Sequence, residues 1–349
     1  MKRFFATLVA AVIAAGSLCA CSKAPEKNSS LSIVTTIFPE YDWVMNVLGD
    51  NPAKADVTML QNNGADLHSF QPTTADIIKI TECDIFVYVG GESDEWVDDV
   101  LKEATNKNMT VINLMDVLGD SVKEEEVVEG MQEEDEHEHE HDEDDHDHDE
   151  DHDEDHDEDH DHEHHHEEGE IEYDEHVWLS LKNAAVLVNS ISEALQKTDP
   201  ANASVYKANA ESYIARLNAL DTEYQDAVNN ASVKTLLFGD RFPFRYLVDD
   251  YGLTYYAAFV GCSAESEASF ETITFLAKKT DELSLHSVLT IEGKDHKIAE
   301  TIIDNTASKD QQILTMDSMQ SVTAADVANG VTYISIMENN LSVLKEALK

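Results

Sequence analysis

Short apolar runs alternate with amphipathic stretches through the first third of the chain. Helical patterns begin near Pro39, after the candidate N-cap Thr73 and at Glu95. Before, between and after these helices lie four runs rich in β-branched residues, each with the length of a buried strand: 32–37, 55–60, 84–89 and 110–114. Strands that alternate with helices in this way predict a parallel sheet with helices on its faces.

The second half of the chain opens with helices and then repeats the alternation. One helical pattern spans 183–197, and another begins at Asp199 and Pro200 and continues to Val228 as a single apolar stripe about 45 Å long. Four further strands are predicted at 235–238, 253–260, 286–291 and 312–316, and a helix closes the chain at 332–348. The pattern therefore predicts an α/β fold of two similar lobes, with parallel-type sheets flanked by helices, joined by one long rigid helix.

The first residues have the pattern of an export signal. Lys2 and Arg3 precede an apolar stretch at 4–15, which is too short to span a membrane comfortably. The sequence Leu-Cys-Ala-Cys that ends at Cys21 resembles a bacterial lipobox, which implies cleavage before Cys21 and lipidation of its thiol. We therefore expect a lipoprotein signal peptide at 1–20 and an extracytoplasmic protein whose body is held to the bacterial cell membrane by that lipid.

One internal segment consists almost entirely of Asp, Glu and His. Twelve of the sixteen histidines lie between His137 and His166, at irregular spacing. Imidazoles mixed with carboxylates suit divalent ions such as zinc. The irregular spacing predicts a mobile segment that binds metal at several sites, with no single fixed coordination polyhedron. A solvated, disordered charge run that binds no metal is the alternative.

The same segment explains most of the net charge of -49. It carries 29 of the 72 acidic residues within 124–170, so the rest of the chain is acidic to an ordinary degree. Nothing in this distribution favours nucleic acid as a partner. We expect a monomer with a polar spacer at 21–30, an N-terminal lobe at 31–182 that contains the disordered loop 124–170, a helical region at 183–230 and a C-terminal lobe at 231–349.

Three residues outside the run follow predicted strands or precede helices, where binding residues of α/β proteins gather. His68 lies in the loop after the second strand, His176 lies just before a helix, and Asp317 follows the last strand. Their shared placement makes them candidate metal ligands. No His-Glu-x-x-His helix and no Gly-x-Ser-x-Gly turn is present, so the sequence does not indicate an enzyme.

Short motifs lie at 33–36, 89–91, 176–179, 251–253 and 265–269. With these motifs the chain resembles the bacterial ABC-transporter solute-binding lipoproteins for zinc or manganese. The His-rich loop before the second ligand motif looks like the zinc branch. The resemblance implies that Zn²⁺, or alternatively Mn²⁺, is held between two lobes and delivered to an ABC permease and its ATPase, with His68, His176 and Asp317 as ligands. A surface adhesin or metal buffer is the structural alternative.

The third family ligand is where this chain departs from the pattern. Family members carry His or Glu ten residues before the Tyr-Gly-Leu tyrosine, a position that Arg241 occupies here. Arginine has no acceptor and does not deprotonate, so it cannot ligate. Asp240 is our first substitute and Cys262 the second, although Cys262 also fits a small buried residue; the position could equally stay open to water or to a histidine of the run. We expect Arg241 to pair with Asp240 or Asp317.

Overall fold

The computed structural model describes residues 30–51, 53–132, 172–263, 267–293 and 295–349 of the chain. The predicted signal peptide, Cys21 and most of the acidic His-rich segment therefore lie outside the described residues. Among the residues that are described, no helix is long and apolar enough to cross a membrane.

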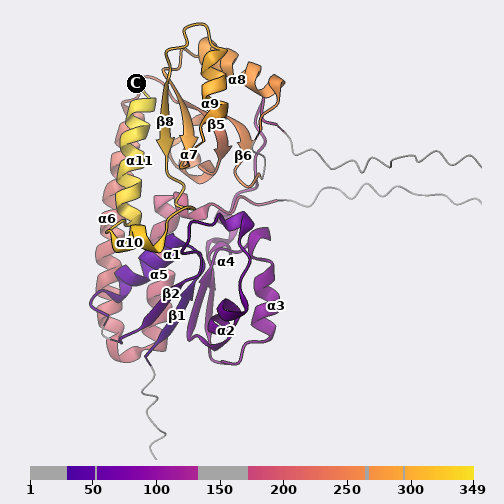
Figure 1. The fold of residues 1–349 in the computed structure, drawn as a ribbon. Coiled ribbons are helices and arrows are strands. Elements are labelled where there is room, and N and C mark those ends of the chain that lie inside the picture. Colours follow the sequence, from indigo (N-terminus) through magenta and orange to yellow (C-terminus); the bar gives the residue numbers. More distant parts are fainter. Residues whose placement is uncertain (1–29, 52, 133–171, 264–266, 294) are drawn as a thin grey trace, which may run out of the picture.

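The first sheet is parallel and has four strands in the order β2-β1-β3-β4 (Figure 1). Its strands are β1 Ser32–Thr35, β2 Asp56–Met59, β3 Ile85–Tyr88 and β4 Thr110–Asn113. Four helices connect or follow them: α1 Phe38–Leu48, α2 Thr74–Glu82, α3 Trp96–Lys102 and α4 Leu114–Leu118. The predicted cap is confirmed, because Thr73 and Asp76 form a reciprocal capping box at the start of α2.

The second sheet repeats this topology, with four parallel strands in the order β6-β5-β7-β8. Its strands are β5 Thr235–Phe242, β6 Thr254–Val260, β7 Ser287–Ile291 and β8 Gln312–Met316. The helices of this half are α7 Arg245–Tyr251, α8 Phe270–Glu282, α9 Lys297–Asp304, α10 Ala324–Ala328 and α11 Tyr333–Ala347. All eight predicted strands are confirmed, but β5 continues to Phe242, so Asp240 and Arg241 lie in a strand.

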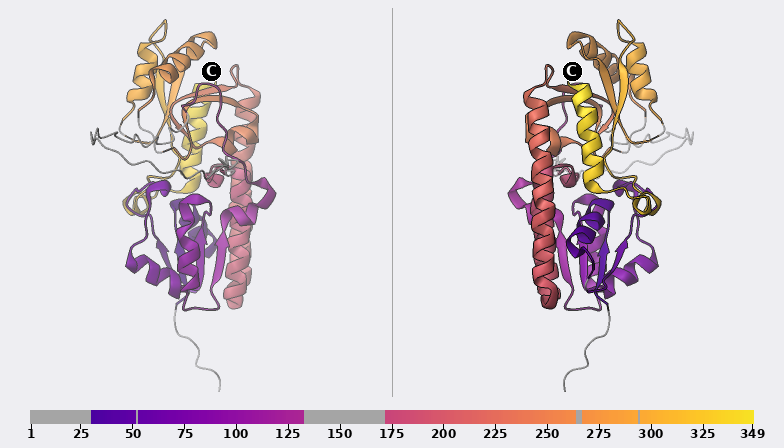
Figure 2. Two further views of the ribbon diagram at one scale, coloured as in Figure 1. Left: turned by 90° about the vertical axis from the view of Figure 1, so that its right-hand side faces the viewer. Right: turned by 90° about the vertical axis from the view of Figure 1, so that its left-hand side faces the viewer.

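A long helix runs beside both sheets (Figure 2). Helix α5 Leu181–Thr198 leads through a 3-10 turn at Pro200–Asn202 into α6 Ala203–Asn229, so the predicted long helix starts slightly later than its pattern suggested. The apolar stripe of α6 is buried. Near one end the Tyr213 hydroxyl donates to Asp42 of α1, and further along Tyr224 donates to the Met337 carbonyl of α11. One continuous helix therefore packs on elements of both halves.

The residues that flank the acidic run are ordered and lie next to each other. Glu124 forms an antiparallel bridge with Tyr173, and the Glu125 N–H donates to the Glu172 carbonyl. Further along, the Gln132 N–H donates to the Ala258 carbonyl of β6. We call residues 122–132 the stem. Residues 124–132 of the stem were expected to be part of a disordered loop of the first lobe, whereas they form these backbone contacts, and the second part of the stem packs on the second sheet.

Candidate metal centre

Three side chains from distant parts of the chain meet between the two sheets. His68 lies in the 3-10 turn Leu67–Ser69 after β2, His176 precedes the 3-10 turn Val177–Leu179, and Cys262 follows β6. One possible ligand atom from each lies within 4.8 Å of the others, and this is the one such group among the described residues. The Nε2 atoms of the two imidazoles are 3.3 Å apart. Both predicted histidines are therefore brought together, with Cys262 as the third member.

His68 is held by contacts on both its backbone and its ring. Asp66 caps the turn and accepts from the His68 N–H. Asp66 also pairs with Arg241 of β5 at 2.7 Å, and although burial acts to raise the pKa of Asp66, that guanidinium lowers it overall. On the ring, Nδ1 lies 2.8 Å from the Ser93 hydroxyl and 3.5 Å from Oε2 of Glu175. Burial and the neighbouring His176 lower the pKa of His68 to about 3, so this imidazole is neutral at physiological pH.

His176 is fully buried and is fixed by the residue two positions before it. Oδ1 of Asp174 accepts from the His176 backbone N–H at 2.8 Å and lies 3.0 Å from its Nδ1. A carboxylate acceptor at Nδ1 places the ring proton there and leaves the lone pair on Nε2, which faces His68. Trp178 lies in the turn that follows and connects it to the second half of the chain, because its indole N–H donates to the Ser318 carbonyl.

Cys262 reaches the two rings because the residue that follows β6 is a glycine, Gly261. A β-carbon at Gly261 would lie 3.0 Å from Cε1 of His176, closer than an ordinary contact. The Cys262 N–H donates to Glu125 of the stem at 3.2 Å. Burial and the carboxylates of Asp174, Glu125 and Glu175 raise the pKa of the Cys262 thiol well above its ordinary value. The thiol therefore keeps its proton until a cation displaces it.

A cavity of about 250 Å³ leads to His68 and Cys262. The other residues that line it are Glu92, Ser93, Glu125, Glu172, Tyr173 and Glu175. Burial raises the pKa of both Glu125 and Glu175. The carboxyl groups of Glu125 and Glu175 lie beside the clustered side chains, where they favour a cation.

The two predicted acidic ligands lie outside this cluster. The Asp240 carboxylate accepts from the backbone N–H groups of Arg241 and Ile291, and Oδ1 of Asp317 accepts from the Met319 N–H. Burial and the nearby Glu292 raise the pKa of Asp317 to about 7. The loop that holds Asp317 still borders the site, because the Gln320 amide lies 3.3 Å from Nε2 of His176.

Arg241 corrects one expectation about the site. We expected its side chain to pair with Asp240 or Asp317, but it pairs with Asp66 and donates to the Ser263 carbonyl. The longer β5 turns the guanidinium towards the turn that holds His68. Ser93, Asp174 and Glu175 also contact the two imidazoles, although no sequence motif assigned them a role. Their one local signal was the pair of carboxylates directly before His176.

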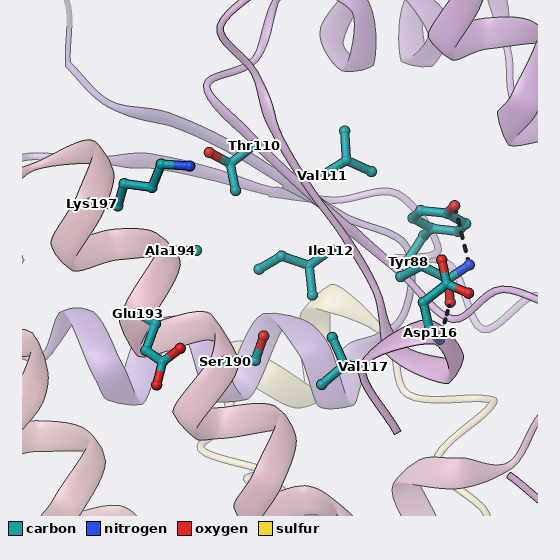
Figure 3. A pocket seen from close by; sticks show the side chains of 11 residues that line it. Tyr88, Thr110, Val111, Ile112, Asp116, Val117, Ser190, Glu193, Ala194 and Lys197 are labelled. Carbon is teal, nitrogen blue, oxygen red and sulfur yellow. Dashed lines mark hydrogen bonds between the residues drawn. The ribbon is translucent and has the colours of Figure 1, made fainter. Parts of the chain in front are cut away.

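A larger hollow of about 560 Å³ lies elsewhere, between β4 and α5 (Figure 3). Its lining mixes aliphatic side chains such as Val111 and Val117 with Glu193 and Lys197 of α5. Within it the Asn113 amide donates to the Tyr88 hydroxyl. No group of clustered ligands lies among its residues, so the chemistry of the described part of the chain is concentrated at the His68 cluster.

Comparisons with known proteins agree with this architecture. Residues 33–347 match the family described as zinc-uptake complex component A, periplasmic. The chain is similar to the zinc-binding lipoprotein AdcA of Streptococcus pneumoniae serotype 4, with 31% identity over 342 residues that cover 97% of this chain and 60% of that protein. It is 30% identical over 330 residues to the zinc-binding protein AdcA of Streptococcus pyogenes serotype M6, which covers 91% of this chain and 56% of that protein. The chain thus spans little more than half the length of these streptococcal relatives.

A shorter relative matches nearly end to end. The high-affinity zinc uptake system protein ZnuA of Bacillus subtilis is 28% identical over 337 residues, covering 97% of this chain and 93% of that protein. Among solved structures, the Zn(II)-bound ZnuA-like domain of Streptococcus pneumoniae AdcA is 26% identical with a TM-score of 0.65, covering 92% of this chain and 99% of that one. The Bacillus subtilis lipoprotein YcdH, 24% identical with a TM-score of 0.67, shares the fold.

Proposed function

We propose, from the premise that this chain belongs to the family of zinc-uptake complex component A, that it captures extracytoplasmic Zn²⁺ and delivers it to an ABC permease. In this role it is a solute-binding component and not an enzyme. A lipid on Cys21 would hold the body at the bacterial cell membrane. The zinc-binding and lipoprotein names of the relatives described above support both parts of this assignment.

The observation that carries the proposal is the spacing of the two imidazoles. Two nitrogens bound to tetrahedral Zn²⁺ at about 2.0–2.1 Å each lie about 3.3 Å apart, which is the separation of the Nε2 atoms of His68 and His176. Asp174 leaves a lone pair on the His176 atom, and His68 is uncharged. Two facing imidazoles in a buried site therefore suit a shared cation.

We assign Cys262 as the third ligand in preference to Asp240. Both Asp240 oxygens already accept backbone hydrogen bonds, whereas the Cys262 sulfur is a member of the ligand cluster. Thiolate is a soft donor, so a site of two imidazoles and one sulfur favours Zn²⁺ over Mn²⁺. Asp317 remains the predicted fourth ligand from the family pattern, with water as the alternative.

The assignment can be tested on the whole chain with Co²⁺ as a coloured substitute for Zn²⁺. Only a bound thiolate gives sulfur-to-cobalt charge-transfer absorption, so the acidic His-rich run does not contribute to this signal. We expect one equivalent of Co²⁺ to give the band in the wild type and in Asp240→Ala, and no band in Cys262→Ser. A band that survives in Cys262→Ser, or is lost in Asp240→Ala, would overturn the choice of ligand.

The transport role needs a separate measurement in cells. Bacteria that lack this protein and grow in zinc-limited medium are complemented with the wild type, with His68→Ala or with Lys207→Ala, a surface residue on α6. We expect zinc accumulation and growth to be restored by the wild type and by Lys207→Ala, but not by His68→Ala. Equal growth with and without the wild-type protein would contradict the proposed role in uptake.

A further inference from the structure

We propose that Ser93 and Glu175 form a positioning unit that holds the His68 ring with its proton on Nδ1 and its lone pair on Nε2. The inference rests on the proposed metal site and deepens it. Neither residue was expected at the site from the sequence, and both act through His68 and not as metal ligands.

The contacts of Glu175 point to this role. Its side chain is 3% exposed. Oε1 accepts from the Ser93 backbone N–H at 2.8 Å. Oε2 accepts no hydrogen bond from the described residues and lies 3.5 Å from Nδ1 of His68. A buried carboxylate oxygen without a donor is costly, and the imidazole N–H is the donor within reach.

Ser93 completes the arrangement. Its hydroxyl lies 2.8 Å from Nδ1 of His68, and the same hydroxyl also interacts with Glu175. Because Glu175 is an acceptor, the Ser93 O–H donates towards the carboxylate and presents its oxygen lone pair to Nδ1. The two residues therefore offer acceptors to one ring nitrogen, which fixes the tautomer that leaves Nε2 free.

The backbone at Gly91 leaves room for the Glu175 side chain. Gly91 has φ +81°, and a β-carbon there would lie 2.3 Å from Oε1 of Glu175 and 2.7 Å from its Cγ. Any residue with a side chain at position 91 would displace the carboxylate. The glycine thus makes the space in which Glu175 can reach both Ser93 and His68.

Asp174, which directly precedes Glu175, orients the His176 ring in the same way. Asp174 accepts from His176, so two consecutive carboxylates serve the two imidazoles, one each. Their rings then direct both Nε2 atoms to one point. Glu175 is not itself a member of the ligand cluster, which is consistent with an action through His68.

The decisive comparison uses the full-length chain with Glu175→Gln and Glu172→Gln. Both variants remove one carboxylate from the same cavity, but Glu172 offers the stem only its backbone carbonyl in the contacts described above. In Glu175→Gln, the oxygen must still accept from Ser93, so the NH₂ group faces Nδ1 and favours the wrong tautomer. We expect the Co²⁺ affinity, read from the charge-transfer band, to fall about 10–100-fold in Glu175→Gln and by less than about 2-fold in Glu172→Gln.

A spectroscopic readout separates positioning from a general loss of structure or charge. The ¹⁵N chemical shifts of the His68 ring in the metal-free protein report which nitrogen carries the proton. We expect the Nδ1–H form in the wild type and in Glu172→Gln, and a shift towards the Nε2–H form in Glu175→Gln, with His176 unchanged as an internal control. Ser93→Ala is expected to shift the His68 ring in the same direction.

Three outcomes would count against the inference. They are an unchanged His68 tautomer in Glu175→Gln, equal losses of affinity in the two glutamine variants, or an Nε2–H ring in the wild type. Each of these leaves the proposed function intact as long as the wild type still gives the thiolate band. Failure of the wild type to bind Co²⁺ or Zn²⁺ at His68 and Cys262 would instead remove the proposed function itself.

Discussion

His68 and Cys262 differ in how strongly each side chain holds a proton in competition with a metal ion. The His68 pKa of about 3 keeps that ring ready to bind even in mildly acidic surroundings. The Cys262 thiol is the opposite case, because burial and the carboxylates around it raise its pKa. An ordinary histidine ligand would lower metal affinity as the pH drops through the histidine range, but His68 in this environment contributes nothing to such a fall above about pH 5.

Metal affinity is therefore expected to rise with pH because of the thiol. A raised thiol pKa means that metal binding must release one proton from Cys262, so the apparent affinity should increase about tenfold per pH unit between about pH 6 and pH 8. Competition titrations of Zn²⁺ against a chelator of known pH dependence would measure it. In Cys262→Ser the slope should flatten, and a wild-type affinity that is independent of pH would contradict thiolate ligation.

At the scale of elements, the sequence predicted the strands and helices well but did not predict that Asp240 lies within a strand. The eight strands follow from β-branched runs, whereas Gly239 and Asp240 are poor strand residues and so hid the second half of β5. Gly239 is needed there because a β-carbon would lie 2.7 Å from the Cα of Ala299 in α9. This close packing is a tertiary effect that no local pattern reveals, and it is what moves Asp240 out of the loop.

The positions of His68 and His176 could be predicted because each lies beside a recognisable element boundary. Cys262 was harder to rank, because its approach to His176 depends on Gly261 and on the stem, which lies more than a hundred residues earlier. The contact between Arg241 and Asp66 joins residues 175 positions apart, so it too depends on how the two sheets meet.

Arg241 connects β5 of one half to the loop of β2 in the other, and its loss should loosen the His68 turn. We expect Arg241→Ala to reduce Co²⁺ affinity by about tenfold, while the free energy of unfolding falls by only about 1 kcal/mol, since the pair is partly exposed. Lys207→Ala, which removes an exposed pair with Glu211 on α6, is the matched control. Equal affinities in the two variants would show that Arg241 does not support the site.

The acidic His-rich run is expected to act as a local reservoir of metal. Its two flanks meet at the mouth of the cavity, so Zn²⁺ held by the run would be at a high effective concentration near the site. Deleting residues 133–169 should lower metal stoichiometry and slow growth under zinc limitation, while the Co²⁺ thiolate band keeps its intensity at saturation. Unchanged stoichiometry and growth would exclude a scavenging role.

At the scale of the whole molecule, α6 limits how far the two halves can separate. It contains neither glycine nor proline and packs on α1, α7 and α11, so bending it would break buried contacts in both halves. The ion pair of Arg241 and Asp66 adds a second connection between the two halves. Metal release is therefore expected to follow small displacements of the ligand loops.

This rigidity can be measured with spin labels attached by a chemistry that spares cysteine. Labels at Lys102 on α3 and Lys278 on α8, both exposed, report the distance between the two halves. We expect the mean distance to change by only a few ångströms when Zn²⁺ is added, with a narrow distribution in both states. A broad distribution without metal that narrows and shortens with it would instead indicate hinge closure.

The bridge between Glu124 and Tyr173 bears on how the protein can vary. It pins both flanks of the intervening segment at one spot on the body, so the segment can gain or lose residues without moving any strand. Doubling its length adds only about 0.6 kcal/mol to the entropic cost of closing the loop. Insertions and deletions in this segment would thus change the amount of metal that it is expected to store, independently of the geometry of the proposed single-ion site.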